Sequence, residues 1–199
     1  MNVKNLKENI DEIDIYLIDQ ILKERYQPGE KILDAGCGNG RNLKWFYNND
    51  FKIYGTDINS DRIKSCQELY PNQKKNFSVA SVEESKFVSN SFNHVICNAV
   101  LHFAKNLSHY LKMFEELLRI LKPQGSLFIR IASNFGIENQ VELIGDGVYK
   151  LPDGSTRFLL TQEIVEQIES RTDITFLENV KTTIVHNQRS MTTLVLKKE

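Results

Sequence analysis

Residues 31–41 of the chain, KILDAGCGNGR, combine a carboxylate with a run of glycines. Apolar residues lead into Asp34, and Gly36, Gly38 and Gly40 follow at alternate positions before a helical pattern begins. Glycine tolerates positive φ and lets the backbone come close to a ligand. Between a strand and a helix, such a turn forms a nucleotide-type pocket at the carboxyl edge of a parallel sheet. The segment therefore predicts a ligand site built on this turn, with an acid at the end of the preceding strand.

The spacing separates this turn from a dinucleotide-binding fingerprint, which has its third glycine one position later, where this chain has Arg41. Instead, residues 34–40, DAGCGNG, resemble motif I of the Rossmann-like S-adenosylmethionine-dependent methyltransferases. S-adenosylmethionine carries a sulfonium, an amino-acid end, a ribose and an adenine, but no phosphate. Its pocket therefore needs close backbone approach rather than a pyrophosphate seat on a helix N-terminus. The alternative is a merely tight turn between strand and helix.

The resemblance implies roles for the residues of this turn. Asp34 matches the acid that helps to hold the ammonium group of the ligand, often through water. The neighbouring residues expected to contact the cofactor are Ala35, Gly36, Cys37, Gly38, Asn39, Gly40 and Asn42. The implied product is S-adenosylhomocysteine, and we expect no metal.

A second acid ends the next predicted strand, residues 51–57. Asp57 matches the ribose-binding acid of the family, because a carboxylate at this place can accept hydrogen bonds from two ribose hydroxyls. Ile58 follows it and is included in the site. The alternative role for Asp57 is a helix cap, but Asn59 and Ser60 lie closer to the following helix and cap equally well.

Two later segments complete the expected cofactor site. After a strand at residues 76–80 the family often has Gly-Asp-Ala, whose Asp contacts the adenine amino group. Here Ser81 takes the Asp position and Val82 follows, while Glu83 is the substitute acceptor. Asn98 lies where the chain of the family passes under the methionine end of the ligand. Its alternative role is a polar residue that closes the strand.

Methyl transfer is an in-line displacement at an already activated carbon, so alignment and exclusion of water matter more than a fixed set of catalytic groups. His102 is the candidate base, because the unperturbed pKa of histidine is near neutrality. Alternatively, His102 packs beside the ligand or faces solvent. We expect His94, inside a strand, and His109, on a long helix, to be structural.

A long connection, residues 133–160, separates the fifth predicted strand from a helix that Thr161 can cap. Its apolar content is too high for disorder, and residues 148–151 and 156–160, on either side of Pro-Asp-Gly, predict a small hairpin. Connections of this length are usually lids or binding loops. We therefore expect the insertion to close over the acceptor and to set substrate choice.

Three residues are candidate contacts for the acceptor. They are Arg130, near the end of the fifth strand, and Tyr149 and Arg157, in the insertion. The two arginines suit an anionic acceptor. The alternative is that each is a surface arginine or one paired with a helix.

Strands alternate with helices along the chain, which is typical of βαβ units and a parallel sheet. Helices are predicted at residues 11–24, 41–47, 60–69 and 107–121, and a fifth strand at residues 126–131. Late strands at about residues 175–183 and 190–196 predict a hairpin, which in this family brings an antiparallel strand into the sheet. We expect an α/β, Rossmann-like three-layer sandwich with a mostly parallel seven-stranded sheet, forming a single domain over residues 1–199.

Composition limits the partners. The chain has 199 residues, 41% of them hydrophobic, a net charge of −1 and no long basic run, so we expect no nucleic-acid partner. The segment after the fourth strand also lacks the Asn/Asp-Pro-Pro-aromatic motif of base amino methylation. A small-molecule acceptor is the better hypothesis, with oxygen, nitrogen and sulfur all open. Residues 38–42 resemble the tellurite-resistance type of methyltransferase, a match too short to transfer a substrate.

The remaining expectations concern compartment and rival functions. Three cysteines argue against a disulfide framework, no segment approaches the roughly 20 apolar residues of a membrane span, and residues 1–9 lack an apolar signal core. We expect a cytoplasmic protein and make no prediction of its oligomeric state. A nicotinamide-dependent reductase would need the missing glycine. A non-catalytic S-adenosylmethionine-binding module would share these motifs and bind the ligand without turnover.

Overall fold

The computed structural model describes residues 3–199, so residues 1 and 2 of the predicted domain, with the start of its polar N-terminal segment, lie outside the described residues. A central sheet has the order β10-β11-β5-β4-β1-β2-β3. Its parallel part consists of β1 (Lys31–Ala35), β2 (Lys52–Asp57), β3 (Phe77–Val79), β4 (Phe92–Asn98) and β5 (Leu121–Ser133). The antiparallel strand β11 (Arg189–Lys198) pairs with β5.

The predicted fold class is confirmed, with one difference at the sheet edge. The outer side of β11 carries two short strands, β9 (Ile174–Phe176) and β10 (Lys181–Val185), rather than one continuous strand. The sheet therefore has eight strands in seven positions along its order. The predicted C-terminal hairpin is present as β10 and β11.

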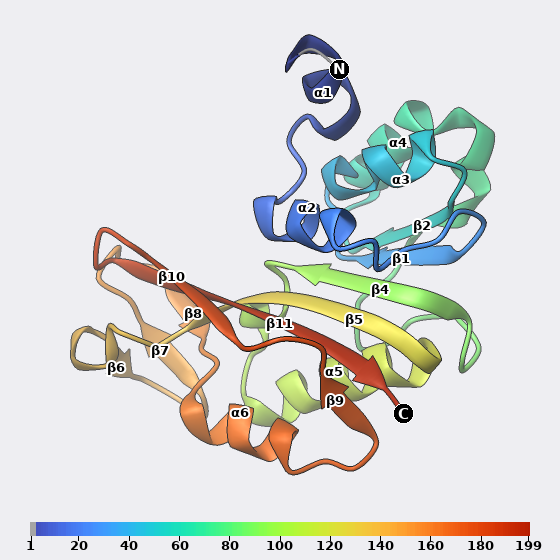
Figure 1. Ribbon diagram of the computed structural model, residues 1–199. Coiled ribbons are helices and arrows are strands. Elements are labelled where there is room, and N and C mark those ends of the chain that lie inside the picture. Colours follow the sequence, from blue (N-terminus) through green and yellow to red (C-terminus); the bar gives the residue numbers. More distant parts are fainter. Residues whose placement is uncertain (1–2) are drawn as a thin grey trace.

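Helices cover both faces of the sheet, which gives the three layers (Figure 1). On one side lie α1 (Val3–Ile10), α2 (Ile15–Leu22), α3 (Lys44–Asn48) and α4 (Ser60–Leu69), and on the other α5 (Leu107–Ile120) and α6 (Gln162–Glu169). Short 3-10 helices cover Arg41–Leu43, Pro71–Asn76, Leu101–Phe103 and Glu138–Gln140. Because side chains alternate along a strand, each strand serves both layers: in β4, Val95 joins the cluster under α5 and α6, whereas Ile96 joins the cluster under α2 to α4.

Helix starts follow local capping chemistry. Asn59 Oδ1 accepts the backbone N–H groups of Asp61 and Arg62, and Asn106 Oδ1 accepts that of His109. The helix predicted for residues 11–24 is shorter because Asp14 caps α2 through the N–H of Tyr16. The expectation for Thr161 is wrong in part, since it occupies the N-cap position of α6 but its side chain makes no capping hydrogen bond.

The insertion forms a separate three-stranded antiparallel sheet. The predicted hairpin is β7 (Val148–Lys150) and β8 (Thr156–Phe158), and an unpredicted strand β6 (Glu142–Leu143) pairs with β7. The fully buried ring of Phe158 stacks on Tyr110 of α5, with ring centroids 4.7 Å apart. The carbonyl oxygen of Asp146 accepts the N–H of Leu107 at the start of α5. The insertion is thus fixed against the N-terminal turn of α5.

Candidate functional site

A cavity of about 640 Å³ opens at the carboxyl ends of β1, β2 and β4. It lies where the strand order reverses on either side of β1, which is the usual place for a ligand in an open α/β sheet. Its size falls within the range of small-molecule sites. The predicted cofactor residues that line it are Gly36, Cys37, Gly38, Asn39, Asn42, Asp57, Ile58, Ser81, Val82, Glu83 and Asn98. Asp34, Ala35 and Gly40 are buried in β1 and the turn.

The glycine turn is shaped by hydrogen bonds to the neighbouring strand. The backbone N–H groups of Gly36 and Cys37 both donate to the carbonyl oxygen of Thr56, each at 2.8 Å. Gly36 has a φ of +80°, and a Cβ placed on it would lie 2.4 Å from Val100 Cγ2. Gly38 has a φ of +54°, and a Cβ there would meet no atom within 4 Å. The fold therefore requires glycine at position 36. At Gly38, which lines the cavity, a methyl side chain would meet no protein atom within 4 Å.

Asp57 connects the glycine turn to the end of β2. One carboxylate oxygen, Oδ2, accepts the N–H of Gly38, and the other, Oδ1, accepts the N–H of Asn59, both at 2.9 Å. Each oxygen keeps lone-pair capacity for a further donor such as a hydroxyl. The capping role is taken by the side chain of Asn59, so Asp57 does not serve as the cap of α4.

Two buried polar side chains beside the glycine turn, Asp34 and Asn98, make no hydrogen bond of ordinary geometry within residues 3–199. Both carboxylate oxygens of Asp34 and both amide atoms of Asn98 are buried without a hydrogen bond to any described residue. Burial raises the pKa of Asp34 to about 7, although the charge of Arg41 and the nearby side chain of Asn42 oppose the rise, and the charge of Asp57 adds slightly to it. Buried polar groups are almost always paired. Here the missing partner is suited to a cationic ligand group beside Asp34.

The other end of the cavity holds a fixed carboxylate. Glu83 Oε1 lies 3.1 Å from His109 Nε2, and His109 Nδ1 accepts the backbone N–H of Lys105 at 3.1 Å. Because Nδ1 acts as the acceptor, Nε2 carries the proton and donates to Glu83. Burial opposes the charged form of Glu83, yet hydrogen bonds from its own backbone N–H and from His109 hold the pKa of its carboxyl below the ordinary value. His109, which the sequence suggested to be only structural, thus lines the cavity and orients Glu83.

The structure does not bring His102 into the cavity. The residue lies in the Leu101–Phe103 turn with 8% of its surface exposed, and its Nδ1 accepts the N–H of Ala132 at 3.4 Å. Burial, together with the charge of Arg157, lowers the pKa of His102 to about 4. The ring is neutral at physiological pH, and its role as a base stays a prediction.

The three candidate acceptor contacts lie in different places. Arg130 forms an ion pair with Asp14 at 3.1 Å and lies over the ring of Tyr16, so it joins β5 to the start of α2. Tyr149 packs against a small cluster of Ala132, Leu151 and Leu159. The side chain of Arg157 contacts a cavity residue, with its guanidinium 5.0 Å from the ring centroid of Phe103. Arg130 instead meets the cavity lining through its backbone, whose carbonyl oxygen accepts the N–H of Ala99 at 2.7 Å.

The segment before α2 closes one wall of the cavity. Glu12 and Arg41 both line it, and the Arg41 guanidinium donates to the carbonyl oxygen of Glu12 at 2.6 Å. The backbone N–H of Asp14 donates to Asn42 Oδ1 at 3.1 Å. These bonds attach the N-terminal segment directly to the glycine turn.

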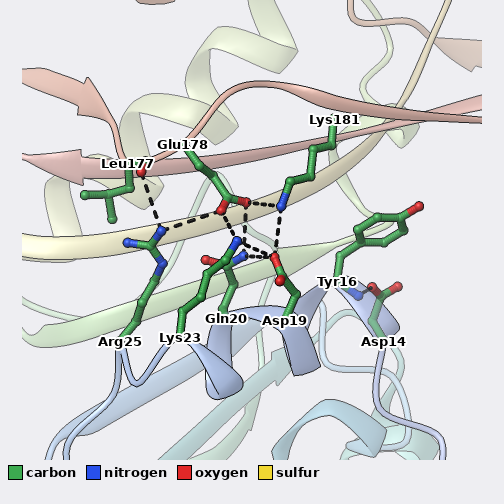
Figure 2. Close-up of polar contacts among 9 residues, drawn as sticks. All are labelled: Asp14, Tyr16, Asp19, Gln20, Lys23, Arg25, Leu177, Glu178 and Lys181. Carbon is green, nitrogen blue, oxygen red and sulfur yellow. Dashed lines mark hydrogen bonds and ion pairs between the residues drawn. The ribbon is translucent and has the colours of Figure 1, made fainter.

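The far end of α2 is held by a network of charges (Figure 2). Figure 2 shows Asp19, Gln20 and Lys23 converging on Glu178, which lies in the interruption between β9 and β10, and on Lys181, the first residue of β10. Lys181 Nζ lies 2.9 Å from Asp19 Oδ2, and Gln20 Nε2 donates to Glu178 Oε1 at 3.0 Å. Helix α2 is therefore fixed at one end to the cofactor cavity and at the other to the sheet edge.

Sequence reasoning missed several cavity residues besides His109. They come from the residue that follows β3, from α4 and α5, and from the segment between β4 and α5: Ala80, Arg62, Met113, Val100, Phe103 and Lys105. No local motif marks them. Within residues 3–199, no group of three or more His, Cys, Asp or Glu side chains is arranged to hold a metal ion. Among the helices that the structure describes, none is long and apolar enough to cross a bilayer.

Comparison with known proteins agrees with this geometry. Residues 33–129 match the family model described as a methyltransferase domain. A tRNA (carboxymethyluridine(34)-5-O)-methyltransferase of Arabidopsis thaliana is 32% identical over 108 residues, which make up 54% of this chain and 25% of that protein. The chain spans between 25% and 65% of the length of the curated relatives it matches.

Solved structures of low identity share the fold. A methyltransferase from Methanosarcina mazei, described as S-adenosylmethionine-dependent, has a TM-score of 0.71 at 17% identity, covering 89% of this chain and 96% of that one. A 1,6-didemethyltoxoflavin-N1-methyltransferase from Burkholderia thailandensis, solved with bound 1,6-didemethyltoxoflavin and S-adenosylhomocysteine, has a TM-score of 0.69 at 14% identity, covering 99% of this chain and 81% of that one.

Proposed function

Because the chain carries a methyltransferase domain of the Rossmann-like, S-adenosylmethionine-dependent class, we propose that it transfers a methyl group from S-adenosylmethionine to a small-molecule acceptor. The observation that carries the proposal is the cavity at the strand-order reversal, with an unpartnered buried carboxylate behind its glycine turn. A ligand with an ammonium group, a ribose and an adenine matches the polar groups along this cavity in order.

Each end of the cavity is assigned to one part of the cofactor. Asp34 and Asn98 would hold the amino-acid end, and Asp57 would accept the ribose hydroxyls through its remaining lone pairs. Glu83 would accept the adenine amino group, since its carboxylate lines the cavity and His109 fixes its position. S-adenosylmethionine supplies the methyl group on a positively charged sulfur that leaves as a neutral thioether. The protein would orient the acceptor and exclude water. The N-terminal segment at Glu12 forms one wall of the cavity and would help to exclude water.

The acceptor class rests on charge and on the structural neighbours. A net charge of −1 gives little attraction for a nucleic-acid backbone. The neighbour from Burkholderia thailandensis binds a small molecule, whereas the Arabidopsis relative acts on tRNA and is about four times as long as the matched segment. The cavity itself, with a volume of about 640 Å³, is of the size that small-molecule sites have, and it supports a small-molecule acceptor.

Calorimetric titration of the full chain with S-adenosylmethionine, S-adenosylhomocysteine and NADH tests the cofactor. We expect the two sulfur compounds to bind with dissociation constants of about 1–100 μM and NADH to show no binding. Binding of NADH alone would replace the proposal with a reductase. Tight binding of S-adenosylmethionine with no methyl transfer to any compound of a broad acceptor panel would favour a non-catalytic binding module.

Replacing Glu83 with glutamine should weaken S-adenosylhomocysteine binding by about tenfold, because the carboxylate that accepts the adenine amino group is lost. Binding of the 6-oxo analogue S-inosylhomocysteine should weaken less or improve, since a glutamine amide can donate to its oxygen. Calorimetry with both ligands measures the change in selectivity. The matched control is Glu84→Gln, because Glu84 is exposed and does not line the cavity. Equal selectivity in Glu83→Gln and wild type would remove Glu83 from the adenine site.

A further inference from the structure

One aromatic ring at the cavity is left open to solvent. Phe103 lines the cavity with 60% of its surface exposed, although it follows directly on two buried residues, Leu101 and His102. The buried ring of His102 packs against the ring of Phe103, with the two centroids 4.6 Å apart. A large exposed aromatic side chain beside a ligand cavity is a natural platform for a flat apolar group.

Arg157 lies on strand β8 of the insertion, which places it beside this ring. Its guanidinium lies 5.0 Å from the centroid of Phe103. The following residue, Phe158, is fully buried and stacks on Tyr110, while Arg157 itself pairs across the small sheet with Tyr149. Because neighbouring side chains of a strand point to opposite faces, burial of Phe158 on α5 fixes the direction of Arg157.

Arg157 differs from the other arginines in having no carboxylate oxygen of a described residue within ion-pair distance, although its charge contributes to the lowered pKa of Asp153. Each of the others has a carboxylate oxygen within 4.0 Å: Arg25, Arg41, Arg62, Arg119, Arg130, Arg171 and Arg189. Arg157 forms no such pair with any described residue, and its one hydrogen bond is to the carbonyl oxygen of Thr156. Asp153, which lies on the same hairpin, is bound by Ser155 and Arg189 instead.

A second cation without an ion pair in the described chain is Lys105, two residues after Phe103. Lys105 lines the cavity and has no ion pair among the described residues, although its backbone N–H is bound to His109. It directly precedes the cap of α5, whose N-terminus adds further positive potential. The carboxylates that line the cavity are not paired with these two cations. Asp57 accepts the backbone N–H of Gly38, Glu83 is bound by His109, and Glu12 lies on the wall formed by the N-terminal segment.

From these contacts we propose that the methyl acceptor is a flat, apolar molecule with one anionic group, a carboxylate or a phosphate, which lies on Phe103 and is bound by Arg157 and Lys105. The inference rests on the proposed function, because it assigns the acceptor side of the same cavity. The planar fork of an arginine binds a carboxylate or phosphate through two parallel hydrogen bonds, and lysine adds a point charge. The insertion then contributes to substrate choice through a single side chain.

Titration of the full chain, saturated with S-adenosylhomocysteine, with three matched probes tests this site. The probes are 2-naphthoate, 2-naphthyl phosphate and the neutral 2-naphthamide, followed by NMR. We expect at least one anion to bind about tenfold more tightly than the amide, and the tighter anion identifies the preferred group. Arg157→Gln should weaken that anion by about tenfold and Lys105→Gln by less, whereas Phe103→Leu should weaken all three probes.

The control is Arg171→Gln, which removes an arginine paired with Glu115 and Asp173, neither of which lines the cavity, and should leave all three affinities unchanged. Equal binding of the amide and the anions, or unchanged anion binding in Arg157→Gln and Lys105→Gln, overturns the proposal. Failure of the wild type to bind S-adenosylhomocysteine counts against the proposed function instead. In that case, the same titrations of the ligand-free chain still test the two cations.

Discussion

Replacing Asp34 with asparagine should weaken S-adenosylhomocysteine binding by about 100-fold at pH 8, because the buried carboxylate is then no longer available to the ligand ammonium group. The same change should make the ligand-free protein more stable at pH 8 by about 2–4 kcal/mol. The reason is that wild-type Asp34 must ionise while fully buried, and the nearby Arg41 and Asn42 offset only part of the cost of desolvation. Calorimetry and urea unfolding at pH 8 measure the two effects. A substitution that stabilises the protein while abolishing its ligand binding is the expected signature of a functional carboxylate.

The pH dependence follows from the direction of the shift. The pKa of Asp34 is raised from 3.8 to about 7 in the folded, ligand-free protein. A raised pKa means that the folded state binds more protons than the unfolded state between these values, so the contribution of Asp34 to stability falls as the pH rises from about 4 to about 7. Near pH 4 the stability difference between wild type and Asp34→Asn should therefore nearly vanish.

Ligand binding should show the opposite trend. The ligand ammonium group favours the charged carboxylate, so binding below pH 7 must release the proton of Asp34. We expect the dissociation constant of S-adenosylhomocysteine to rise by about tenfold per pH unit below pH 7 and to be smallest near pH 8, because the ligand ammonium group itself loses its proton at higher pH. Calorimetry in two buffers of different ionisation enthalpy should detect close to one released proton at pH 6 in the wild type and none in Asp34→Asn. Affinity that is independent of pH in the wild type would remove Asp34 from the ligand site.

The sequence predicted those parts of the fold that depend on local pattern. The alternation of buried strands with amphipathic helices predicted the parallel sheet, and the Pro-Asp-Gly turn predicted the hairpin of the insertion. The split of the edge strand into β9 and β10 could not be predicted in this way. The chain leaves the sheet after Leu177, where the Leu177 carbonyl and the Glu178 side chain accept hydrogen bonds from Arg25 and Gln20, more than 150 positions away in the chain.

The same distinction between local pattern and long-range packing applies to the residues of the candidate site. Residues that belong to a contiguous motif, from Gly36 to Asn42, were found because strand, turn and helix are neighbours in sequence. The pairing of Phe103 with Arg157 depends on how the insertion packs against α5, and no sequence spacing encodes it. His102 and Phe103 show the difference at single-residue scale, since adjacent side chains of one 3-10 turn are directed to the core and to the cavity respectively. Which of the two faces the ligand is decided by packing rather than by residue type.

Two alanine substitutions in the glycine turn should separate the needs of the fold from those of the ligand. Gly36→Ala should destabilise the protein by about 2–4 kcal/mol, because its Cβ would lie 2.4 Å from Val100 and its φ is +80°. Gly38→Ala should cost only about 1 kcal/mol, since its φ is +54° and its Cβ would meet no protein atom. Urea unfolding at pH 7 measures both, and Val100→Ala combined with Gly36→Ala should recover part of the loss by relieving the contact.

The effects on ligand binding should have the opposite order from the effects on stability. The larger loss of affinity is expected at Gly38. The methyl group of Gly38→Ala would project from a residue that lines the cavity, with no protein atom within 4 Å, into space that the cofactor must pass closely. We expect S-adenosylhomocysteine binding to weaken by about 30-fold or more in this well-folded variant. The Gly36→Ala, Val100→Ala double variant should bind more tightly than Gly38→Ala if it folds. Wild-type affinity in Gly38→Ala would mean that no ligand approaches this turn, and the proposed cofactor site would have to be abandoned even though the fold remained correct.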